Sequence, residues 1–137
     1  MYKGTVYPWH CDHMGHMNVM WYVGKFDEAN WNLFNHVGIT SDYLKSQSRA
    51  MAGVQQNIAY RQELLAGDVV EVRSRILEVR EKSLRVEHEM RHVNRDVAAA
   101  LMELTAVHLD AMTRKACPFP ADILRTATAL LEPASSH

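Results

Sequence analysis

Apolar residues recur at three- and four-residue intervals between Val19 and Val37, and polar residues fill the positions between them. This period is that of an amphipathic helix, here about five turns long. Asn18 precedes it as a plausible N-cap, and Gly38 follows where a C′ glycine is expected. The apolar face is predicted to hold Val19, Tyr22, Val23, Phe26, Ala29, Asn30, Leu33 and Val37. The opposite, polar face is predicted to hold Lys25, Glu28, Asn32 and Asn35.

The second half of the chain has a different period, because apolar and polar residues alternate there one by one. Alternation of this kind predicts strands, here around residues 54–60, 70–76, 84–91 and 97–109. Gly67-Asp68 and Asn94-Arg95-Asp96 mark turns, and the hairpin spacing makes the strands antiparallel neighbours. A short strand over Lys3–Trp9 precedes the helix. The order predicts an α+β fold in which the helix covers one face of the sheet.

With 137 residues and a net charge of −1, the chain has the size of one domain and no basic excess of the kind that nucleic-acid binders show. We predict a domain over residues 1–126 and a loose tail over 127–137, where the sequence turns small and polar. Neither a signal peptide nor an apolar run of membrane-spanning length is visible. The two cysteines, Cys11 and Cys117, lie far apart. A reduced cytoplasmic setting with free thiols is therefore expected.

The loop from His10 to Asn18 is dense in reactive side chains and admits three interpretations. A metal site is disfavoured, because the spacing of His10, His13 and His16 matches no zinc motif and no distant pair completes a ligand set. For any single histidine, an ordinary solvated or half-buried ring is the favoured interpretation.

The third interpretation centres on Asp12 and the start of the helix. A helix amino terminus offers free N–H groups and a partial positive charge, which suit the oxyanion of an attacked acyl group. An aspartate just upstream can attack that carbonyl or activate a water molecule. Gly15 would let the loop turn tightly. From the residues alone all three interpretations stay open.

The run Trp9–Asn18, followed by Tyr22, Phe26 and Ala29, resembles the hotdog-fold acyl-CoA thioesterases of the 4-hydroxybenzoyl-CoA thioesterase-like group. The positions that match the group's signature are Asp12, Gly15, His16, Asn18 and Tyr22. Weaker likeness continues to about Leu109, through the turn at 63–68 and the hairpin at 81–83. The resemblance implies a hotdog fold, in which an antiparallel sheet wraps around one long helix, and a hydrolase that splits an acyl-CoA thioester into free acid and coenzyme A.

The resemblance also implies roles for individual residues. Asp12 would be the nucleophile or general base, and the backbone amide of Val19 would bind the oxyanion. Gly15 and Asn18 would complete the catalytic loop. The substrate would meet Tyr22 and His16, and Tyr60 from the second strand of a partner subunit. Coenzyme A phosphates would meet Arg80, Lys82 and Ser83. A homodimer, or a tetramer of two dimers, with active sites at the dimer interface is implied, and no metal, cofactor, nucleic acid or membrane.

Two departures from the family pattern stand out. Many relatives carry an acid where this chain has His10, which argues against a paired-carboxylate scheme, and a protonated His10 would favour the Asp12 carboxylate. Many relatives also have an asparagine at Val19, although a backbone donor is indifferent to its side chain. Two alternatives remain beside the thioesterase: a hotdog enoyl-CoA hydratase or dehydratase, and a non-catalytic acyl-CoA-binding protein. The many aromatic residues suit core or dimer contacts, or else an acyl pocket for an aromatic or quaternary-ammonium group.

Overall fold

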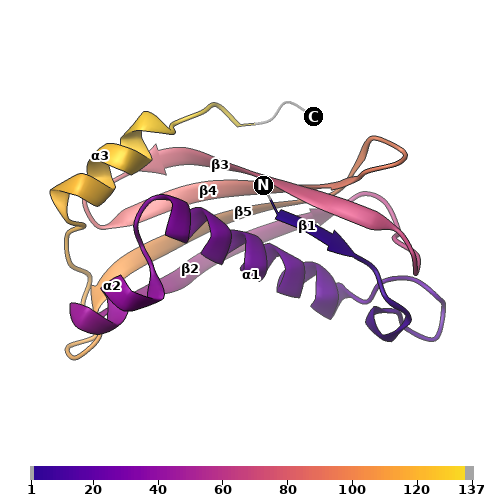
Figure 1. Cartoon of the computed structure of the whole chain (residues 1–137), viewed down its shortest axis with the longest axis horizontal. Helices are drawn as coiled ribbons and strands as arrows, with labels where there is room; N and C mark the ends of the chain where they lie inside the picture. The colour runs from indigo at the N-terminus through magenta and orange to yellow at the C-terminus, as the bar shows by residue number, and fades with distance from the viewer. Residues whose placement is uncertain (1, 135–137) are drawn as a thin grey trace. The chain divides into compact units, whose positions relative to one another are not determined.

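The computed structural model describes residues 2–134 and contains five strands, three α-helices and one 3₁₀ turn (Figure 1). The strands form one sheet in the order β1-β3-β4-β5-β2. A short strand, a long helix and four further strands follow one another as the sequence predicts. In chain order the elements are β1 (Tyr2–Thr5), η1 (Pro8–His10), α1 (Val19–His36), α2 (Ser41–Ser46), β2 (Arg49–Tyr60), β3 (Val69–Val79), β4 (Ser83–His92), β5 (Val97–Asp110) and α3 (Ala121–Ala129).

Helix α1 begins and ends where the sequence predicts. The Asn18 side chain accepts a hydrogen bond from the Met20 amide at 3.0 Å, which is the N-cap interaction. Gly38 has a φ of +100°, a left-handed conformation that glycine adopts without strain. Two expectations about its faces are wrong, because Val19 of the predicted apolar face is exposed and Lys25 of the predicted polar face is buried. The first turn of the helix, at Val19, is open to solvent, which leaves its apolar side chain uncovered. Lys25 is buried against β1. Its ammonium group reaches the backbone carbonyl of Thr5, 3.2 Å away in β1.

Strand β1 is shorter than predicted and ends at Thr5. It pairs antiparallel with β3, with Tyr2 opposite Val72 and Thr5 opposite Val69. The predicted strand over Lys3–Trp9 is wrong at its end, because Pro8 opens a 3₁₀ turn that contains Trp9. Proline suits the first position of such a turn, since it has no N–H to leave unpaired.

Two helices were not predicted. Helix α2 starts after Thr40, whose side-chain oxygen accepts from the Tyr43 amide at 3.1 Å. Helix α3 buries Ile123 and Ala127. The loose tail predicted from residue 127 is therefore wrong at its start, because Ala127 packs inside a helix and the Glu132 amide bonds to the Ile76 carbonyl. The rest of that tail, residues 135–137, lies outside the described residues.

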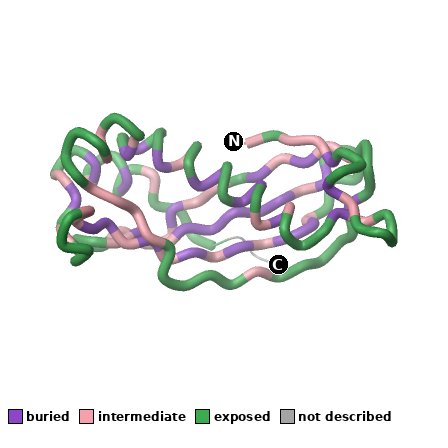
Figure 2. Tube along the Cα trace, turned by 90° about the horizontal axis from the view of Figure 1, so that it is seen from below, coloured by how far each residue is buried: buried purple, intermediate pink, exposed green. Residues whose placement is uncertain are grey.

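The chain divides into two compact units. Buried positions gather along β3, β4 and β5, whereas the positions of β2 are intermediate or exposed (Figure 2). The first unit comprises residues 1–32, 58–74 and 88–102, and the second comprises 33–57, 75–87 and 103–137. Each unit has its own apolar core around one fully buried histidine, His88 in the first and His108 in the second. The expected single domain over residues 1–126 stays a prediction.

Candidate active site

The loop that carries Asp12 is a closed turn in the first unit. Its two arms bridge at Cys11 and Met17, and the Asp12 amide donates to the His16 carbonyl at 2.9 Å. The turn closes with a bond of 3.0 Å from the Gly15 amide to the Asp12 carbonyl, and Gly15 has a φ of +81°. A side chain at that position would be strained, which explains the glycine. The loop is thus held by its own backbone.

The Asp12 side chain is exposed at the first position of this turn. One carboxylate oxygen accepts a hydrogen bond from the Met14 amide at 2.9 Å. A carboxylate has two oxygens and several lone pairs, so this contact orients the group and leaves acceptor capacity free. Asp12 is therefore positioned and accessible, as a nucleophile or base must be.

The helix start lies directly after this loop. The Asn18 amide donates to the His10 carbonyl at 2.8 Å, which fastens the end of the loop to its beginning. The next amide, that of Val19, is the first of α1, and within residues 2–134 no backbone carbonyl accepts from it. Val19 is 57% exposed. A free donor at a helix amino terminus is suited to hold an oxyanion.

Tyr22 is buried on α1, and its hydroxyl donates to the Gln62 carbonyl at 3.0 Å. Burial, reinforced by Glu63, raises the pKa of Tyr22 to about 12, so the phenol stays protonated. The Tyr60 ring meets it edge to face, with centroids 5.2 Å apart. Tyr22 and Tyr60 of the same chain therefore contact each other, a pairing that sequence reasoning did not foresee.

His16 is tied to the segment between β2 and β3. Its Nε2 lies 3.1 Å from a Glu63 carboxylate oxygen, and the backbones of His16 and Leu65 form a bridge. The Met17 amide also donates to the Leu64 carbonyl at 2.7 Å. The consecutive residues 63–65 thus hold the arm of the loop that contains His16 and Met17. Nothing in the sequence pattern singled out Glu63.

His10 is buried, and its ring packs on Trp21 with centroids 4.5 Å apart. Its Nδ1 accepts from the Tyr7 amide at 3.1 Å. Burial and then the nearby charge of Lys25 lower the pKa of His10, so the ring is neutral at pH 7. The sequence-based expectation that a protonated His10 favours the Asp12 carboxylate is therefore not supported.

The three residues predicted to bind coenzyme A phosphates lie in the second unit, at the hairpin between β3 and β4. Arg80 and Lys82 are exposed, and Ser83 is half-buried. Arg80 forms an ion pair of 2.6 Å with Glu78, and its amide donates to the Ser83 carbonyl. Their role stays a prediction, since Arg80 would have to share its charge with Glu78.

Cys11 and Cys117 are both free thiols. In the described part of the chain, no three histidine, cysteine or carboxylate side chains converge as metal ligands would. Likewise, none of the described helices combines the length and the apolar character needed to cross a membrane. The cytoplasmic location stays a prediction.

A family model described as "Thioesterase-like superfamily" matches residues 6–126. The chain belongs to this superfamily. It is 26% identical over 131 residues to a betainyl-CoA thioesterase from Pseudomonas aeruginosa, an alignment that covers 96% of this chain and 82% of the relative. The predicted family is therefore confirmed, and with it the enzyme class of thioester hydrolases.

Two solved structures show the same fold. One is a protein from Staphylococcus aureus in complex with CoA, with a TM-score of 0.91 and 18% identity, covering 99% of this chain and 87% of the other. The second is a 1,4-dihydroxy-2-naphthoyl-CoA thioesterase from Synechocystis, with a TM-score of 0.84 and 18% identity, covering 96% and 97%. The predicted α+β hotdog fold is confirmed.

Proposed function

We propose that the protein hydrolyses an acyl-CoA thioester to a free acid and coenzyme A, with Asp12 as nucleophile or general base. The observation that carries this proposal is the placement of Asp12 in an exposed, hydrogen-bonded turn that leads into α1. The first amide of that helix, at Val19, has no backbone acceptor among residues 2–134. An attacking carboxylate and an oxyanion donor are the two parts that acyl transfer needs. The superfamily and the CoA-bound structural neighbour support the acyl-CoA substrate.

Two reaction courses fit this arrangement. In the first, an Asp12 oxygen attacks the thioester carbon, the carbonyl oxygen becomes an oxyanion held by the Val19 N–H, and the C–S bond breaks to release coenzyme A as a thiolate. Water then hydrolyses the resulting anhydride and restores the carboxylate. In the second, Asp12 takes a proton from water, and the hydroxide attacks the same carbon directly. Neither course needs a metal or a cofactor, because coenzyme A is part of the substrate.

The remaining loop residues would act by position. Gly15 allows the turn that presents Asp12, and Asn18 caps the helix that presents Val19. His16, fixed by Glu63, and the buried Tyr22 would form the wall nearest the acyl group. Arg80, Lys82 and Ser83 would meet the coenzyme A phosphates.

We also propose that the protein acts as a homodimer, alone or as half of a tetramer, with a partner subunit completing each site. Strand β2 is at one end of the sheet order, and its residues from Gly53 to Asn57 are exposed in the isolated chain, including Val54 at 61%. A strand at the end of a sheet has unpaired backbone N–H and C=O groups, and a second copy of the chain can pair with them and cover Val54. In such a dimer Tyr60 is near enough to the edge to serve the partner's site.

The experiment that tests the proposed reaction is a thiol-release assay with the purified protein. The panel spans short, branched, aromatic and quaternary-ammonium acyl-CoAs, the last because of the betainyl-CoA relative. We expect release of coenzyme A from at least one class. Addition of water to crotonyl-CoA without thiol release would instead identify a hydratase. Tight coenzyme A binding with no turnover anywhere in the panel would identify a binding protein.

A further inference from the structure

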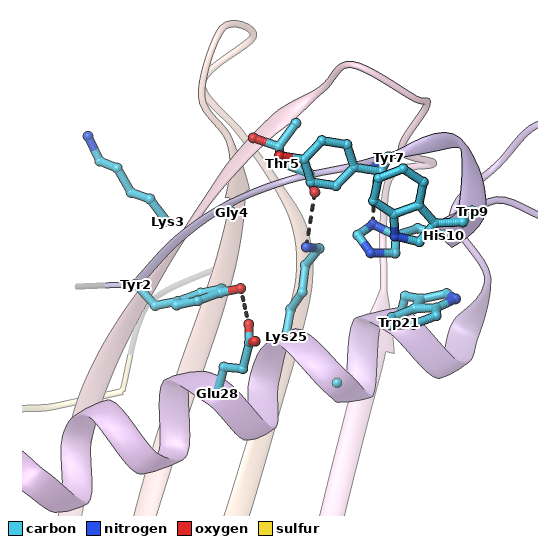
Figure 3. Close-up of a pocket in the computed structure, with 11 residues that line it drawn as sticks. Tyr2, Lys3, Gly4, Thr5, Tyr7, Trp9, His10, Trp21, Lys25 and Glu28 are labelled. Atoms are coloured by element: carbon cyan, nitrogen blue, oxygen red, sulfur yellow. Dashed lines mark hydrogen bonds between the residues drawn. The ribbon is translucent and has the colours of Figure 1, made fainter.

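A second pocket lies in the first unit, between β1 and the first turns of α1 (Figure 3). Its volume is about 520 Å³, within the range typical of small-molecule sites. None of the residues that line it belongs to the Asp12 turn or to the segment from Gly15 to Met20. The pocket is therefore not lined by Asp12 or Val19, the two residues that carry the proposed reaction.

Aromatic rings form one end of this pocket. The rings of Tyr7 and Trp9 are stacked, with centroids 4.5 Å apart and an angle of 7° between their planes, and Trp9 is 66% exposed. The His10 ring lies edge-on to both, and on its other side it packs against Trp21. Figure 3 shows these four rings gathered at the same end of the pocket. A flat aromatic ligand would find stacking surfaces there.

Hydrogen-bond donors are placed beside these rings. The Lys25 ammonium group donates one hydrogen bond, to the Thr5 carbonyl. In the described part of the chain it forms no ion pair. His10 accepts at Nδ1 from the Tyr7 amide, so its ring proton is on Nε2, where no described residue accepts it. Lysine has no acceptor atoms and neutral histidine has one nitrogen left to donate. The pocket thus offers two donors that lack a full set of partners.

The charges of the pocket favour an anion. Two ammonium groups, Lys3 and Lys25, line it together with a single carboxylate, Glu28. The Tyr2 hydroxyl donates a hydrogen bond to that carboxylate, so one of its oxygens already has a partner. A buried ammonium without a carboxylate in contact is costly, and a bound anion would compensate it.

We propose that this pocket binds a planar aromatic carboxylic acid, with its ring among Tyr7, Trp9 and Trp21 and its carboxylate on Lys25 and the Nε2–H of His10. A cation such as a quaternary ammonium group would meet the aromatic rings but also the Lys25 charge. The ligand is therefore an aromatic acid rather than an aromatic cation. Because neither Asp12 nor Val19 lines the pocket, we expect the acid to bind there without being transformed.

Gly24 offers a clean way to close the pocket. It lines the cavity from the second turn of α1, and a Cβ at this position would meet only the Trp21 ring, at 3.9 Å. Leucine is also a better helix former than glycine. Gly24→Leu should therefore fill the pocket while leaving the fold intact.

The test is calorimetric titration of the full chain with 2-naphthoate, beside neutral 2-naphthamide and phenyltrimethylammonium. Naphthoate is expected to bind the wild type and Asp12→Asn equally. Lys25→Met should weaken binding at least about tenfold, since a charge-assisted hydrogen bond is worth that much or more. Gly24→Leu should weaken it at least as much, because the leucine side chain fills the space that the ring needs. Lys45→Met, a control at an exposed lysine on α2 that does not line the pocket, should change it less than about threefold, as screened surface charges do. Naphthamide should bind at least about tenfold more weakly than naphthoate.

Three results would overturn the proposal. The first is the absence of naphthoate binding to the wild type. The second is binding that survives Gly24→Leu and disappears in Asp12→Asn, which would place the acid in the hydrolytic site. The third is tighter binding of phenyltrimethylammonium than of naphthoate, which would assign the pocket to cations.

Discussion

At the scale of single residues, the least expected feature is a buried polar chain in the first unit. The fully buried His88 bonds through Nδ1 to the Ser74 hydroxyl at 2.7 Å and through Nε2 to the Asn30 side-chain oxygen. In its neutral form the ring donates from Nε2 to Asn30 and accepts at Nδ1 from Ser74, so both of its nitrogens are satisfied. These side-chain hydrogen bonds connect Asn30 of α1 to His88 of β4, and His88 to Ser74 of β3.

The protonation of His88 should make the protein sensitive to acid. Burial lowers the pKa of His88 from 6.5 to about 4 in the folded state. Between pH 6.5 and about 4, His88 is therefore protonated in the unfolded chain and neutral in the folded chain. Stability should fall as the pH drops toward 4, by about 1.4 kcal/mol for each pH unit from this group alone.

Urea unfolding at pH 7.5, 6.0 and 5.0 measures this effect, with His88→Gln compared with the exposed control His13→Gln. Other titrating groups are shared by all variants, so the slopes isolate His88. The wild type and His13→Gln should lose stability more steeply than His88→Gln. Equal slopes in all three proteins would show that His88 accepts a proton without unfolding.

At the scale of elements, the start of α1 connects stability to the proposed site. The Asn18 side chain satisfies the Met20 amide, and the same helix end presents Val19. Asn18→Ala should reduce the free energy of unfolding by about 1 kcal/mol, because the cap is lost. Asn18→Asp keeps the acceptor and should stay within a few tenths of a kcal/mol of the wild type. Denaturant unfolding of the three proteins checks this, and equal stability of Asn18→Ala and the wild type would contradict it.

The helix and the later strands were predictable because their periods are long and regular. The end of β1 was not, because Tyr7 and Trp9 suit a strand by composition and only Pro8 signals the turn. Helix α2 is short, and its one signal is the capping residue Thr40. Helix α3 follows Pro120 and has Asp122 in its first turn, and both features are typical of a helix amino terminus.

Within the candidate site, the sequence predicts the arrangement of the loop but not the distant residues that contact it. Asp12, Gly15 and Asn18 are set by local spacing, so their arrangement could be predicted. The partners of His16 and Lys25, which are Glu63 and the Thr5 carbonyl, come from distant segments. Pairing across such distances depends on tertiary packing, which periodicity does not encode. The second pocket was missed for the same reason.

At the scale of the whole molecule, the exposed face of β2 predicts the oligomeric state. Sedimentation or light scattering should give at least twice the 15.7 kDa mass of the chain. Val54→Lys replaces an exposed apolar residue of this strand with a charge and should shift the population toward monomer with little effect on the isolated fold. Met112→Lys is the control, since Met112 is 82% exposed in the loop after β5 and should not affect assembly. A monomeric wild type, or a Val54→Lys protein that assembles like the wild type, would contradict the proposed dimer.

The central claim of a carboxylate acting beside a free helix amide is tested most directly by thiol release in Asp12→Asn. Asn is nearly isosteric and can still accept from the Met14 amide, so the loop and the unfolding free energy should be preserved. Asp27→Asn is the matched control, an exposed aspartate on α1 outside the loop. With the best acyl-CoA of the panel, Asp12→Asn should lower kcat on the order of a hundredfold or more, and Asp27→Asn should leave it unchanged. A folded Asp12→Asn protein that retains wild-type kcat would contradict the account.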